Sequence, residues 1–340
     1  MKKLLRIISR FKKSNILVIG DLILDEFIWG KAQRLSPEAP VPVVWAQEKS
    51  FIPGGACNVA SNITSLGSKV TLSGVVGKDT LADTLFSELN KRKIGTKGIV
   101  VDKKRATISK TRVIAQHQQV VRVDWEDIKA VSSSAQSKIL NFIKNNLDKF
   151  DAIIIEDYGK GVITKELLVK IKICASGKKI ITVDPKEEHF SMYKDLDATA
   201  ITPNRSEAEN AIRNIKISDV DNKLHIFSDK LRTDGDIKKA GRELLKYFNS
   251  KAVLITLGES GMRLFQKGKD KPVSISTVAK DVFDVSGAGD TVIAVFTLAL
   301  ASGATMLEAA YLANYAAGIV VGKIGTATVS QKELIKRIRR

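Results

Sequence analysis

Short apolar runs rich in Ile, Val and Leu recur along the 340-residue chain, and most are followed by a segment whose apolar residues repeat with a helical period. Buried strands that alternate with helices indicate an α/β fold, with a mostly parallel central sheet and helices on both faces. Ligands bind such a sheet at the carboxyl ends of its strands. The runs predict strands at 15–21, 69–77, 151–158, 179–185, 198–204 and 252–258, and the periodic segments predict helices at 56–66, 80–93, 133–148, 164–176, 205–213 and 235–249.

Two segments, residues 29–53 and 107–127, break this alternation with an apolar–polar pattern of period two. Pro37, Pro40 and Pro42 disfavour a helix in the first segment and suit an edge strand or an extended arm. We therefore expect one domain across the whole chain, from whose sheet edge these segments project as a small β subdomain. Such a subdomain is suited to act as a lid, as a dimer surface or as both.

Charge and cysteine content narrow the class of protein. The net charge of +18 and the pI of about 9.7 raise the question of nucleic-acid binding. However, the basic residues are spread along the chain, and no zinc finger or RNP-like motif accompanies them, so we expect no nucleic-acid partner. A positive field equally attracts a small anionic substrate. Cys57 and Cys174 form neither a CxxC pair nor a metal-ligand cluster, which predicts a reducing, cytoplasmic setting.

The N-terminal stretch MKKLLRIISRFKKSN places Leu4, Ile7, Ile8 and Phe11 on one side of a helix and basic residues on the other. Arg6 and Arg10 interrupt the apolar run, so we do not expect a signal peptide. A membrane-surface helix and a helix docked on the following domain both fit this pattern, and we expect the docked helix. The sequence has no run of about 18 apolar residues, so we expect no membrane span.

Two stretches early in the chain offer groups that bind hydroxyls, as a sugar site requires. Asp21 follows the first predicted strand, where its carboxylate could accept two hydroxyl hydrogen bonds or cap a turn, and Asp25 is a second candidate. In PGGACNVASNITSLG, Gly54 and Gly55 permit a tight turn, and Asn58 presents an amide from the first turn of a helix. A glycine turn that leads into a capped helix explains the same three residues.

Two later stretches suit a nucleotide and its metal. In TPNRSEAE, Asn204 follows a strand and Glu207 comes three residues later, a pair suited to nucleotide phosphates and to Mg²⁺ with its waters. The same spacing fits a capping box. Lys186, in VDPKEEHF, lies at a strand end, where it either meets a phosphate or is an ordinary surface lysine.

The stretch FDVSGAGDTV carries the most chemistry. Its glycines, Gly287 and Gly289, precede an apolar helix whose first backbone N–H groups form an anion site. It lacks the Lys-Ser/Thr ending of a P-loop, and it adds Asp290, which either caps the helix or accepts a proton. With the hydroxyl-binding and metal-binding candidates, this stretch predicts phosphoryl transfer to an alcohol, a reaction in which the protein mainly positions reactants and stabilises charge.

These residues resemble the PfkB-type (ribokinase-like) carbohydrate kinases over nearly the whole chain. GGACNVASNITSLG is similar to the first signature of that family, and DVSGAGDT is similar to the second and more specific one. The resemblance implies a ribokinase-like fold, with ATP and Mg²⁺ as cofactors. Asp284 and Ser286 match the start of a monovalent-cation loop, which implies a K⁺ site. Ser286 where Thr is common and Cys57 where Ala is common are mild departures from the pattern.

The resemblance also implies a role for each candidate residue. It makes Asp290 the base and assigns the anion hole to the backbone N–H groups of Gly287, Ala288 and Gly289. It gives Glu207 to Mg²⁺ through water. The sugar would be held by Asp21, Gly54, Gly55 and Asn58. Arg112 and Lys186 would bind phosphate groups, and the sequence does not say which of them binds the sugar phosphate and which the nucleotide. The nucleotide would be held by Asn204, Glu207, Thr256, Gly258, Gly261 and Asn314.

Further stretches, among them RLSPEAPVPVV, EDYGKG and VDPK, resemble the subgroup that phosphorylates the C1 hydroxyl of D-glycero-β-D-manno-heptose 7-phosphate. The product would be heptose 1,7-bisphosphate, a precursor of ADP-heptose for surface glycans. In many bacteria such a kinase is joined to a nucleotidyltransferase marked by HxGH. No HxGH occurs here, so we expect a kinase-only form, dimeric through the β subdomain. A kinase for another sugar, a catalytically silent sugar or nucleotide sensor and a nucleic-acid-binding protein are the rival hypotheses.

Overall fold

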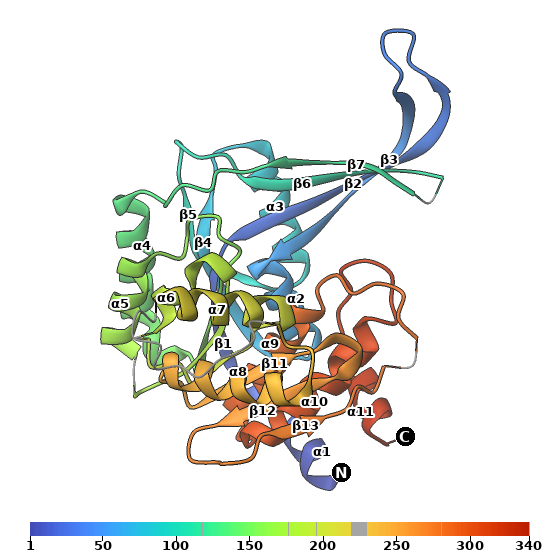
Figure 1. The fold of residues 1–340 in the computed structure, drawn as a ribbon. Coiled ribbons are helices and arrows are strands. Elements are labelled where there is room, and N and C mark those ends of the chain that lie inside the picture. Colours follow the sequence, from blue (N-terminus) through green and yellow to red (C-terminus); the bar gives the residue numbers. More distant parts are fainter. Residues whose placement is uncertain (117, 176, 195, 219–229, 280, 340) are drawn as a thin grey trace.

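The computed structural model describes residues 1–116, 118–175, 177–194, 196–218, 230–279 and 281–339. A nine-stranded sheet lies at its centre (Figure 1), with the strand order β13-β12-β11-β10-β9-β8-β1-β4-β5. The strands from β11 to β5 are parallel, and β12 and β13 are antiparallel at one edge, which confirms the predicted mostly parallel sheet. The bounds are β1 Asn15–Gly20, β4 Lys69–Val76, β5 Gly95–Val101, β8 Ala152–Glu156, β9 Ile180–Asp184, β10 Ala200–Ile201, β11 Ala252–Thr256, β12 Met262–Gln266 and β13 Val273–Ile275.

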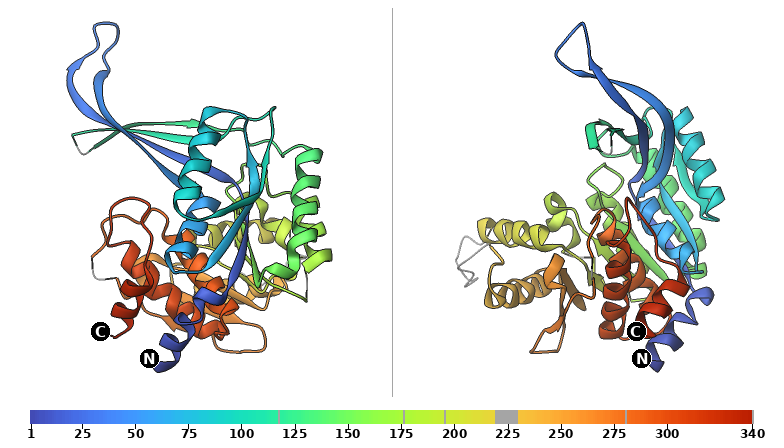
Figure 2. Two further views of the ribbon diagram at one scale, coloured as in Figure 1. Left: turned by 180° about the vertical axis from the view of Figure 1, so that it is seen from behind. Right: turned by 90° about the vertical axis from the view of Figure 1, so that its right-hand side faces the viewer.

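Helices cover both faces of this sheet (Figure 2), because the central strands are apolar on both sides and must be buried on both. One face carries α1 (Lys2–Ile8), α2 (Ala56–Ser65), α3 (Thr80–Lys91), α9 (Ala288–Ala301), α10 (Met306–Val320) and α11 (Gln331–Arg339). The other carries α4 (Ser133–Asn146), α5 (Lys165–Ala175), α6 (Phe190–Tyr193), α7 (Arg205–Ser218) and α8 (Asp234–Tyr247). Short 3₁₀ turns lie at η1 Phe11–Lys13, η2 Leu147–Lys149, η3 Glu187–His189 and η4 Gly258–Ser260.

The predicted helices and strands lie close to the observed ones, with one clear exception. The strand predicted at 198–204 is reduced to β10, two residues long. Pro203 has no N–H to give to a sheet, so regular pairing stops before it, and Asn204 joins Thr256 only through an isolated bridge. The helices and strands that were not predicted at all are β5, β12, β13, α6, α10 and α11.

A second sheet projects from the first and is seen at the top of Figure 1. Its strand order is β3-β2-β6-β7, with β2 Leu22–Leu35, β3 Pro42–Gly55, β6 Ile108–Ala115 and β7 Gln118–Trp125. The described residues of the segments 29–53 and 107–127 lie in and beside this sheet, whereas His117 is outside the described residues. The sheet begins earlier than expected, because β2 starts at Leu22, two residues after β1 ends.

The basic N-terminal stretch forms a docked helix, as expected. Ile7, Ile8 and Phe11 are buried in the main core, and the side-chain amide of Gln331, in α11, donates a hydrogen bond to the Ile8 carbonyl at 3.0 Å. The N-terminus and the last described residues therefore lie near each other (Figures 1 and 2). Among the described helices, none has the length and apolar character that a membrane crossing needs.

Candidate active site

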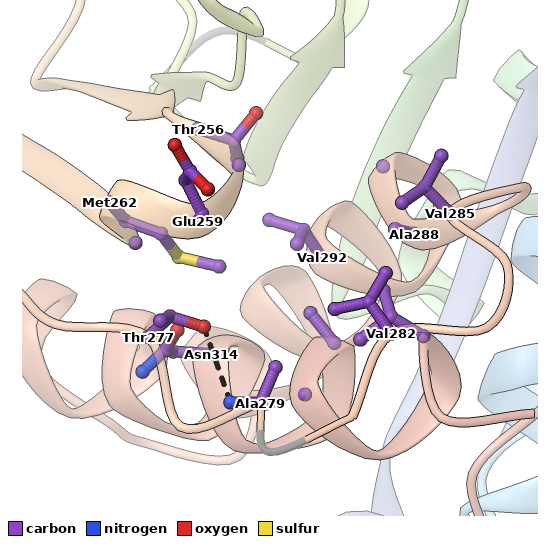
Figure 3. Close-up of a pocket in the computed structure, with 16 residues that line it drawn as sticks. Thr256, Glu259, Met262, Thr277, Ala279, Val282, Val285, Ala288, Val292 and Asn314 are labelled. Carbon is purple, nitrogen blue, oxygen red and sulfur yellow. Dashed lines mark hydrogen bonds between the residues drawn. The ribbon is translucent and has the colours of Figure 1, made fainter.

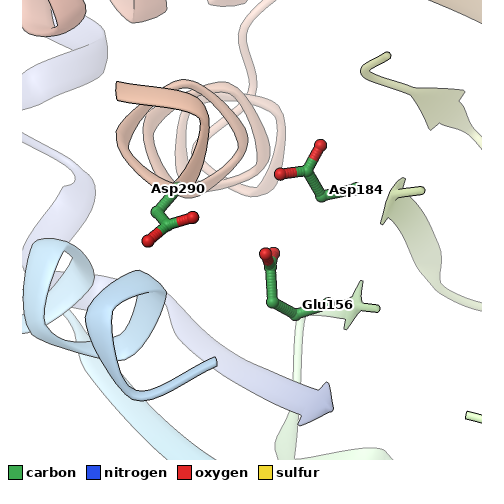
Figure 4. Close-up of side chains that lie close together, drawn as sticks. All are labelled: Glu156, Asp184 and Asp290. Carbon is green, nitrogen blue, oxygen red and sulfur yellow. The ribbon is translucent and has the colours of Figure 1, made fainter. Parts of the chain in front are cut away.

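Three carboxylates converge at the carboxyl edge of the central sheet. Glu156 ends β8, Asp184 ends the neighbouring β9, and Asp290 lies in the first turn of α9, which points at the same edge (Figure 4). One carboxylate oxygen from each residue lies within 4.8 Å of the other two. Parallel neighbouring strands bring their ends together, so the fold itself places the first two side by side.

If all three carboxylates of this buried cluster were ionised with no cation among them, they would repel one another strongly. Burial raises the pKa of Glu156 and that of Asp184 well above their ordinary values, and the neighbouring carboxylates raise both further. The Glu156 Oε2 atom is buried without a hydrogen-bond partner in the structure. An unsatisfied carboxylate oxygen beside two other carboxylates is a donor set that suits a hard divalent cation such as Mg²⁺.

Asp290 is held by two hydrogen bonds, one to each carboxylate oxygen. The Asn58 side-chain amide, from α2, donates to Oδ2 at 2.6 Å, and the Tyr158 hydroxyl donates to Oδ1 at 2.8 Å. Burial raises the pKa of Asp290, and these two hydrogen bonds oppose that rise. A buried carboxylate with an elevated pKa and a fixed orientation is suited to accept a proton.

The turn before α9 supplies the predicted glycines. Gly287 caps the helix in the left-handed conformation, with φ at 74°, and a Cβ built there would lie 2.6 Å from the Asn58 amide nitrogen. The Ala288 N–H donates to the Val285 carbonyl at 3.1 Å. The Ala288 amide is therefore engaged within the turn.

A cavity of about 530 Å³ opens beside this turn (Figure 3), in the size range of small-molecule sites. Val282, Val285 and Val292 line one side of it, and Met262 and Glu259 line the other. Six residues predicted for the nucleotide side or the anion hole border this cavity, namely Thr256, Gly258, Gly261, Ala288, Gly289 and Asn314. The structure therefore brings these residues together although they span nearly sixty positions of the chain.

One wall of the cavity is fixed by internal hydrogen bonds. Asn314, buried in α10, donates its amide to the Ser276 carbonyl at 2.8 Å. Three residues on, the Ala279 N–H donates to the Thr277 hydroxyl at 3.2 Å, the bond drawn in Figure 3. Asn314 thus shapes the segment that lines the cavity.

Asn204 and Glu207 form the capping box that was the alternative reading of their spacing. The Asn204 N–H donates to Glu207 Oε2 at 2.8 Å, and the Glu207 N–H donates to Asn204 Oδ1 at 2.9 Å, at the start of α7. Burial raises the pKa of Glu207 to about 7, against the hydrogen bond from Asn204 and the charge of Lys186. The Glu207 charge in turn contributes to the raised pKa of Asp184, so the cap lies beside the carboxylate cluster.

Arg112 and Lys186 lie in different surroundings. Arg112, in β6, donates to Asp25 Oδ1 at 2.6 Å, and its guanidinium lies 5.4 Å from the centre of the Phe27 ring. Lys186 follows β9, packs its side chain against Gly159 and acts electrostatically on Glu207. The first residue therefore belongs to the base of the second sheet, and the second to the carboxylate cluster.

Asp21, predicted to contact the sugar, is engaged by the backbone of the loop after β8. It is fully buried, with Oδ2 accepting the N–H groups of Tyr158 and Lys160 and Oδ1 accepting the N–H of Val162, at 3.0 to 3.1 Å. These bonds make it a support for the loop after β8. Asp25, the second candidate, instead lies beside the predicted sugar-side glycines.

The glycine pair Gly54–Gly55 ends β3 and leads into α2. The Asp25 carboxylate lies directly against Gly54, so a side chain at this position would have to displace that carboxylate. Gly55 is the N-cap of α2 at a φ of 57°, a conformation that favours glycine. Both glycines therefore have structural reasons to be glycine, and they bring the backbone close to Asp25 and Asn58.

Asp284 ties the turn before α9 to a second turn near residue 325. Its Oδ1 accepts the Ser286 N–H at 2.8 Å, and its Oδ2 accepts the Gly325 N–H at 3.0 Å. Burial opposes ionisation of Asp284, but these hydrogen bonds and the charge of Arg112 hold its pKa below the ordinary value. The predicted cation-loop residues are thus adjacent and ordered.

Sequence analysis assigned no individual role to Glu156, Tyr158 or Asp184, although the first two lie in EDYGKG and the third lies in VDPK. The available signal for both carboxylates was the same, a charged residue that closes a buried apolar run. The role of Tyr158 could not be seen in the sequence, because its partner Asp290 lies 132 positions away.

Comparison with known proteins defines the class. The pfkB family carbohydrate kinase pattern matches residues 13–333, and the chain belongs to this family. A relative from Desulfatibacillum aliphaticivorans called bifunctional protein HldE is 43% identical over 328 residues, which cover 96% of this chain and 63% of the relative. The protein of the same name from Helicobacter pylori strain J99 is 44% identical over 321 residues, or 94% of this chain and 65% of the relative. The chain thus spans less than two thirds of these relatives.

Solved structures agree on the fold. Phosphofructokinase-2 from Escherichia coli, in complex with substrates and products, superposes with a TM-score of 0.74 at 18% identity, covering 96% of this chain and 98% of that chain. Ribokinase from Thermotoga maritima gives a TM-score of 0.71 at 20% identity, covering 96% and 100%. The predicted family, the ribokinase-like fold and the class of enzyme, a sugar kinase, are confirmed.

Proposed function

We propose that this protein transfers the γ-phosphate of ATP to the C1 hydroxyl of D-glycero-β-D-manno-heptose 7-phosphate and produces heptose 1,7-bisphosphate. The observation that carries the proposal is the first turn of α9. One side of that turn borders the nucleotide-sized cavity, and Asp290 on the same turn is held by Asn58. The heptose acceptor is supported by the subgroup motifs in the sequence and by identity of 43% to a relative named HldE.

The reaction needs one proton acceptor and one anion site. The sugar hydroxyl gives its proton to the Asp290 carboxylate, its oxygen bonds to the γ-phosphorus, and the bond from that phosphorus to the ADP oxygen breaks. We assign the charge stabilisation to the backbone N–H groups of Gly287 and Gly289, because the Ala288 amide is engaged with Val285. Amides at a helix N-terminus are suited to this role, since they require no reorganisation during the reaction.

We assign Mg²⁺ to Glu156 and Asp184, with Glu207 acting through water as the sequence suggested. The buried, unpartnered Glu156 Oε2 supports this assignment. When bound, the ion would neutralise phosphate charge and the charge of the cluster. For K⁺ we keep the predicted loop at Asp284 and Ser286, where two backbone N–H groups already order the Asp284 carboxylate.

The surroundings of Arg112 and Lys186 support a division of the phosphate contacts. We assign Arg112 to the 7-phosphate of the sugar, because it adjoins Asp25 at the sugar side. Lys186 is assigned to the ATP phosphates, because it adjoins Glu207. Asp25 replaces Asp21 as the proposed hydroxyl acceptor, together with Asn58.

The second sheet is proposed to act as lid and as dimer surface. It exposes several large apolar side chains, among them Trp45 and Trp125, whose exposed fractions are 65% and 64%. This much exposed apolar surface is unusual for a small sheet. Two copies packed through these side chains would remove them from water. ATP as donor and two free cysteines support a cytoplasmic setting.

A panel of acceptors tests the proposal. Release of ADP would be measured with heptose 7-phosphate, fructose 1-phosphate and ribose, with and without K⁺. We expect turnover with heptose 7-phosphate to exceed turnover with the other two. Turnover with a different sugar alone would reassign the protein to a related kinase. Absence of turnover with every acceptor, combined with sugar or nucleotide binding, would make it a sensor.

A further inference from the structure

The loop that follows β8, residues 157–162, connects the base to the rest of the site, and none of the sequence motifs assigned it a role. Its second residue, Tyr158, reaches Asp290 across 132 positions of the chain, and the Tyr158 hydroxyl donates to Asp290 Oδ1 at 2.8 Å. The Asn58 amide holds the other oxygen at 2.6 Å. With one donor on each oxygen, the plane of the carboxylate is fixed.

The loop is braced so that the position of Tyr158 is set by the backbone. Asp21 accepts the backbone N–H of Tyr158 itself and also those of Lys160 and Val162. A buried carboxylate that binds three N–H groups of one loop leaves that loop little freedom.

A second buried carboxylate braces the same loop from its start. Asp157 Oδ1 accepts the Gly159 N–H at 2.8 Å, and Oδ2 accepts the Tyr193 hydroxyl at 2.5 Å and contacts His189 Nδ1 at 2.8 Å. Gly161, at a φ of 88°, packs against the Lys129 carbonyl with no space for a side chain. The loop backbone is therefore rigid, and it holds the Tyr158 hydroxyl in a fixed position beside Asp290.

We infer that Tyr158 is a positioning residue for the phosphoryl transfer, which turns the Asp290 carboxylate toward the acceptor hydroxyl. The inference rests on the proposed function of Asp290 as the base. A phenol donates its proton in a hydrogen bond throughout the neutral range, so the contact persists under assay conditions. The Tyr158 hydroxyl is already engaged with Asp290, so we expect its removal to leave substrate binding intact.

The test is Tyr158→Phe, which removes the hydroxyl and keeps the ring. We expect kcat to fall by about ten- to a hundred-fold, the scale of a small misplacement of a reacting group, while KM for ATP and for the sugar phosphate changes by less than about two-fold. A hydroxyl that binds the sugar would instead raise the KM of the sugar phosphate. Such a result would overturn the inference.

A double-mutant cycle with Asp290→Asn separates positioning from general loosening of the site. If Tyr158 acts through Asp290, its removal from the Asp290→Asn enzyme should change the residual kcat by less than about two-fold. A further ten-fold loss in that background would overturn the inference, because it would show an action independent of the base.

Tyr193→Phe is the matched control, since it also removes a phenol hydroxyl from a buried aspartate that braces this loop. We expect it to lower thermal stability at least as much as Tyr158→Phe while lowering kcat far less. Equal losses of kcat in the two variants would overturn the inference in favour of a purely structural role.

The cycle uses whichever acceptor the wild-type enzyme phosphorylates, so a wrong sugar assignment does not affect it. Crystal structures of the wild type and of Tyr158→Phe add a readout independent of turnover. We expect the Asp290 carboxylate to rotate in the variant. An unchanged Asp290 orientation would overturn the inference, whereas a wild type inactive on every acceptor would overturn the proposed function alone.

Discussion

Replacing Gly289 by valine should abolish most activity without harming the fold. Gly289 lies in the first turn of α9 and borders the cavity, and a Cβ built there meets only Asp184 Oδ2, at 3.6 Å, an ordinary contact. Because a β-branched residue is slightly better than glycine inside a helix, we expect the free energy of unfolding to stay within about 0.5 kcal/mol of wild type. The new side chain, however, would stand between the Gly289 amide and the transferred phosphate.

Loss of one such amide should lower kcat by about 10²- to 10³-fold, the usual effect of removing a donor from an anion hole. Gly287→Ala is the informative companion. Its left-handed φ of 74° costs an alanine about 1 to 2 kcal/mol, and its new Cβ, 2.6 Å from the Asn58 amide nitrogen, would also push that donor away from Asp290. This variant should therefore lose both stability and activity.

Urea unfolding and ADP release on the same preparations separate the two effects. We expect Gly289→Val to unfold at the wild-type urea concentration and to turn over slowly, and Gly287→Ala to be impaired in both measurements. Wild-type kcat in Gly289→Val would refute the assignment of the anion site to this turn. Wild-type stability in Gly287→Ala would refute the argument from the left-handed backbone and the Asn58 contact.

Three further predictions concern the charged groups. Asp290→Asn should lower kcat by about 10²- to 10⁴-fold, as for loss of a general base, while ATP affinity measured by calorimetry stays the same; an unchanged kcat would remove Asp290 from the mechanism. Arg112→Gln should raise KM for the sugar phosphate and Lys186→Gln should raise KM for ATP, so the opposite pattern in initial-rate kinetics would reverse our division of the phosphate contacts. The hydrogen bond to Asp157 raises the pKa of His189. The wild type should therefore exceed His189→Gln in stability most clearly below the unfolded histidine pKa of about 6.5, and the difference should shrink as pH rises through the folded pKa. Urea unfolding across that range measures it, and a pH-independent difference would contradict it.

The sequence predicted the central sheet well because its strands are buried on both sides, so their apolar runs are continuous and easily seen. It did not predict α10, although that helix is long, because its apolar residues extend around most of its circumference and give little amphipathic signal. The edge strand β13 has three residues, and its neighbour β12 has five, so neither gives an apolar pattern long enough to stand out in the sequence.

The residues of the candidate site also differ in how well the sequence predicted them. Local motifs located the turn at Gly287 and the capping box at Asn204, because both depend on residues close in sequence. Contacts between residues that are far apart in the sequence could not be predicted. The hydrogen bond from Asn58 to Asp290, for example, joins residues 232 positions apart. The choice between Asp21 and Asp25 also required the structure, since it depends on where the chain leaves the first sheet and enters the second.

The length of β2 has a mechanical consequence. The strand leaves the central sheet beside Asp21 and continues to Leu35, and Asp25 lies near its inner end. At about 3.3 Å per residue, the path along the strand from Asp21 is roughly 13 Å to Asp25 and at most roughly 46 Å to Leu35, because bulges at Trp29/Gly30 and Ala32/Arg34 interrupt the outer part. Asp25 is close to the end that is anchored in the core, and the bulges lie between it and the outer end, so a displacement at Leu35 reaches Asp25 strongly reduced. A partner could therefore hold the outer end loosely and still leave Asp25, the carboxylate proposed for the sugar, nearly undisturbed.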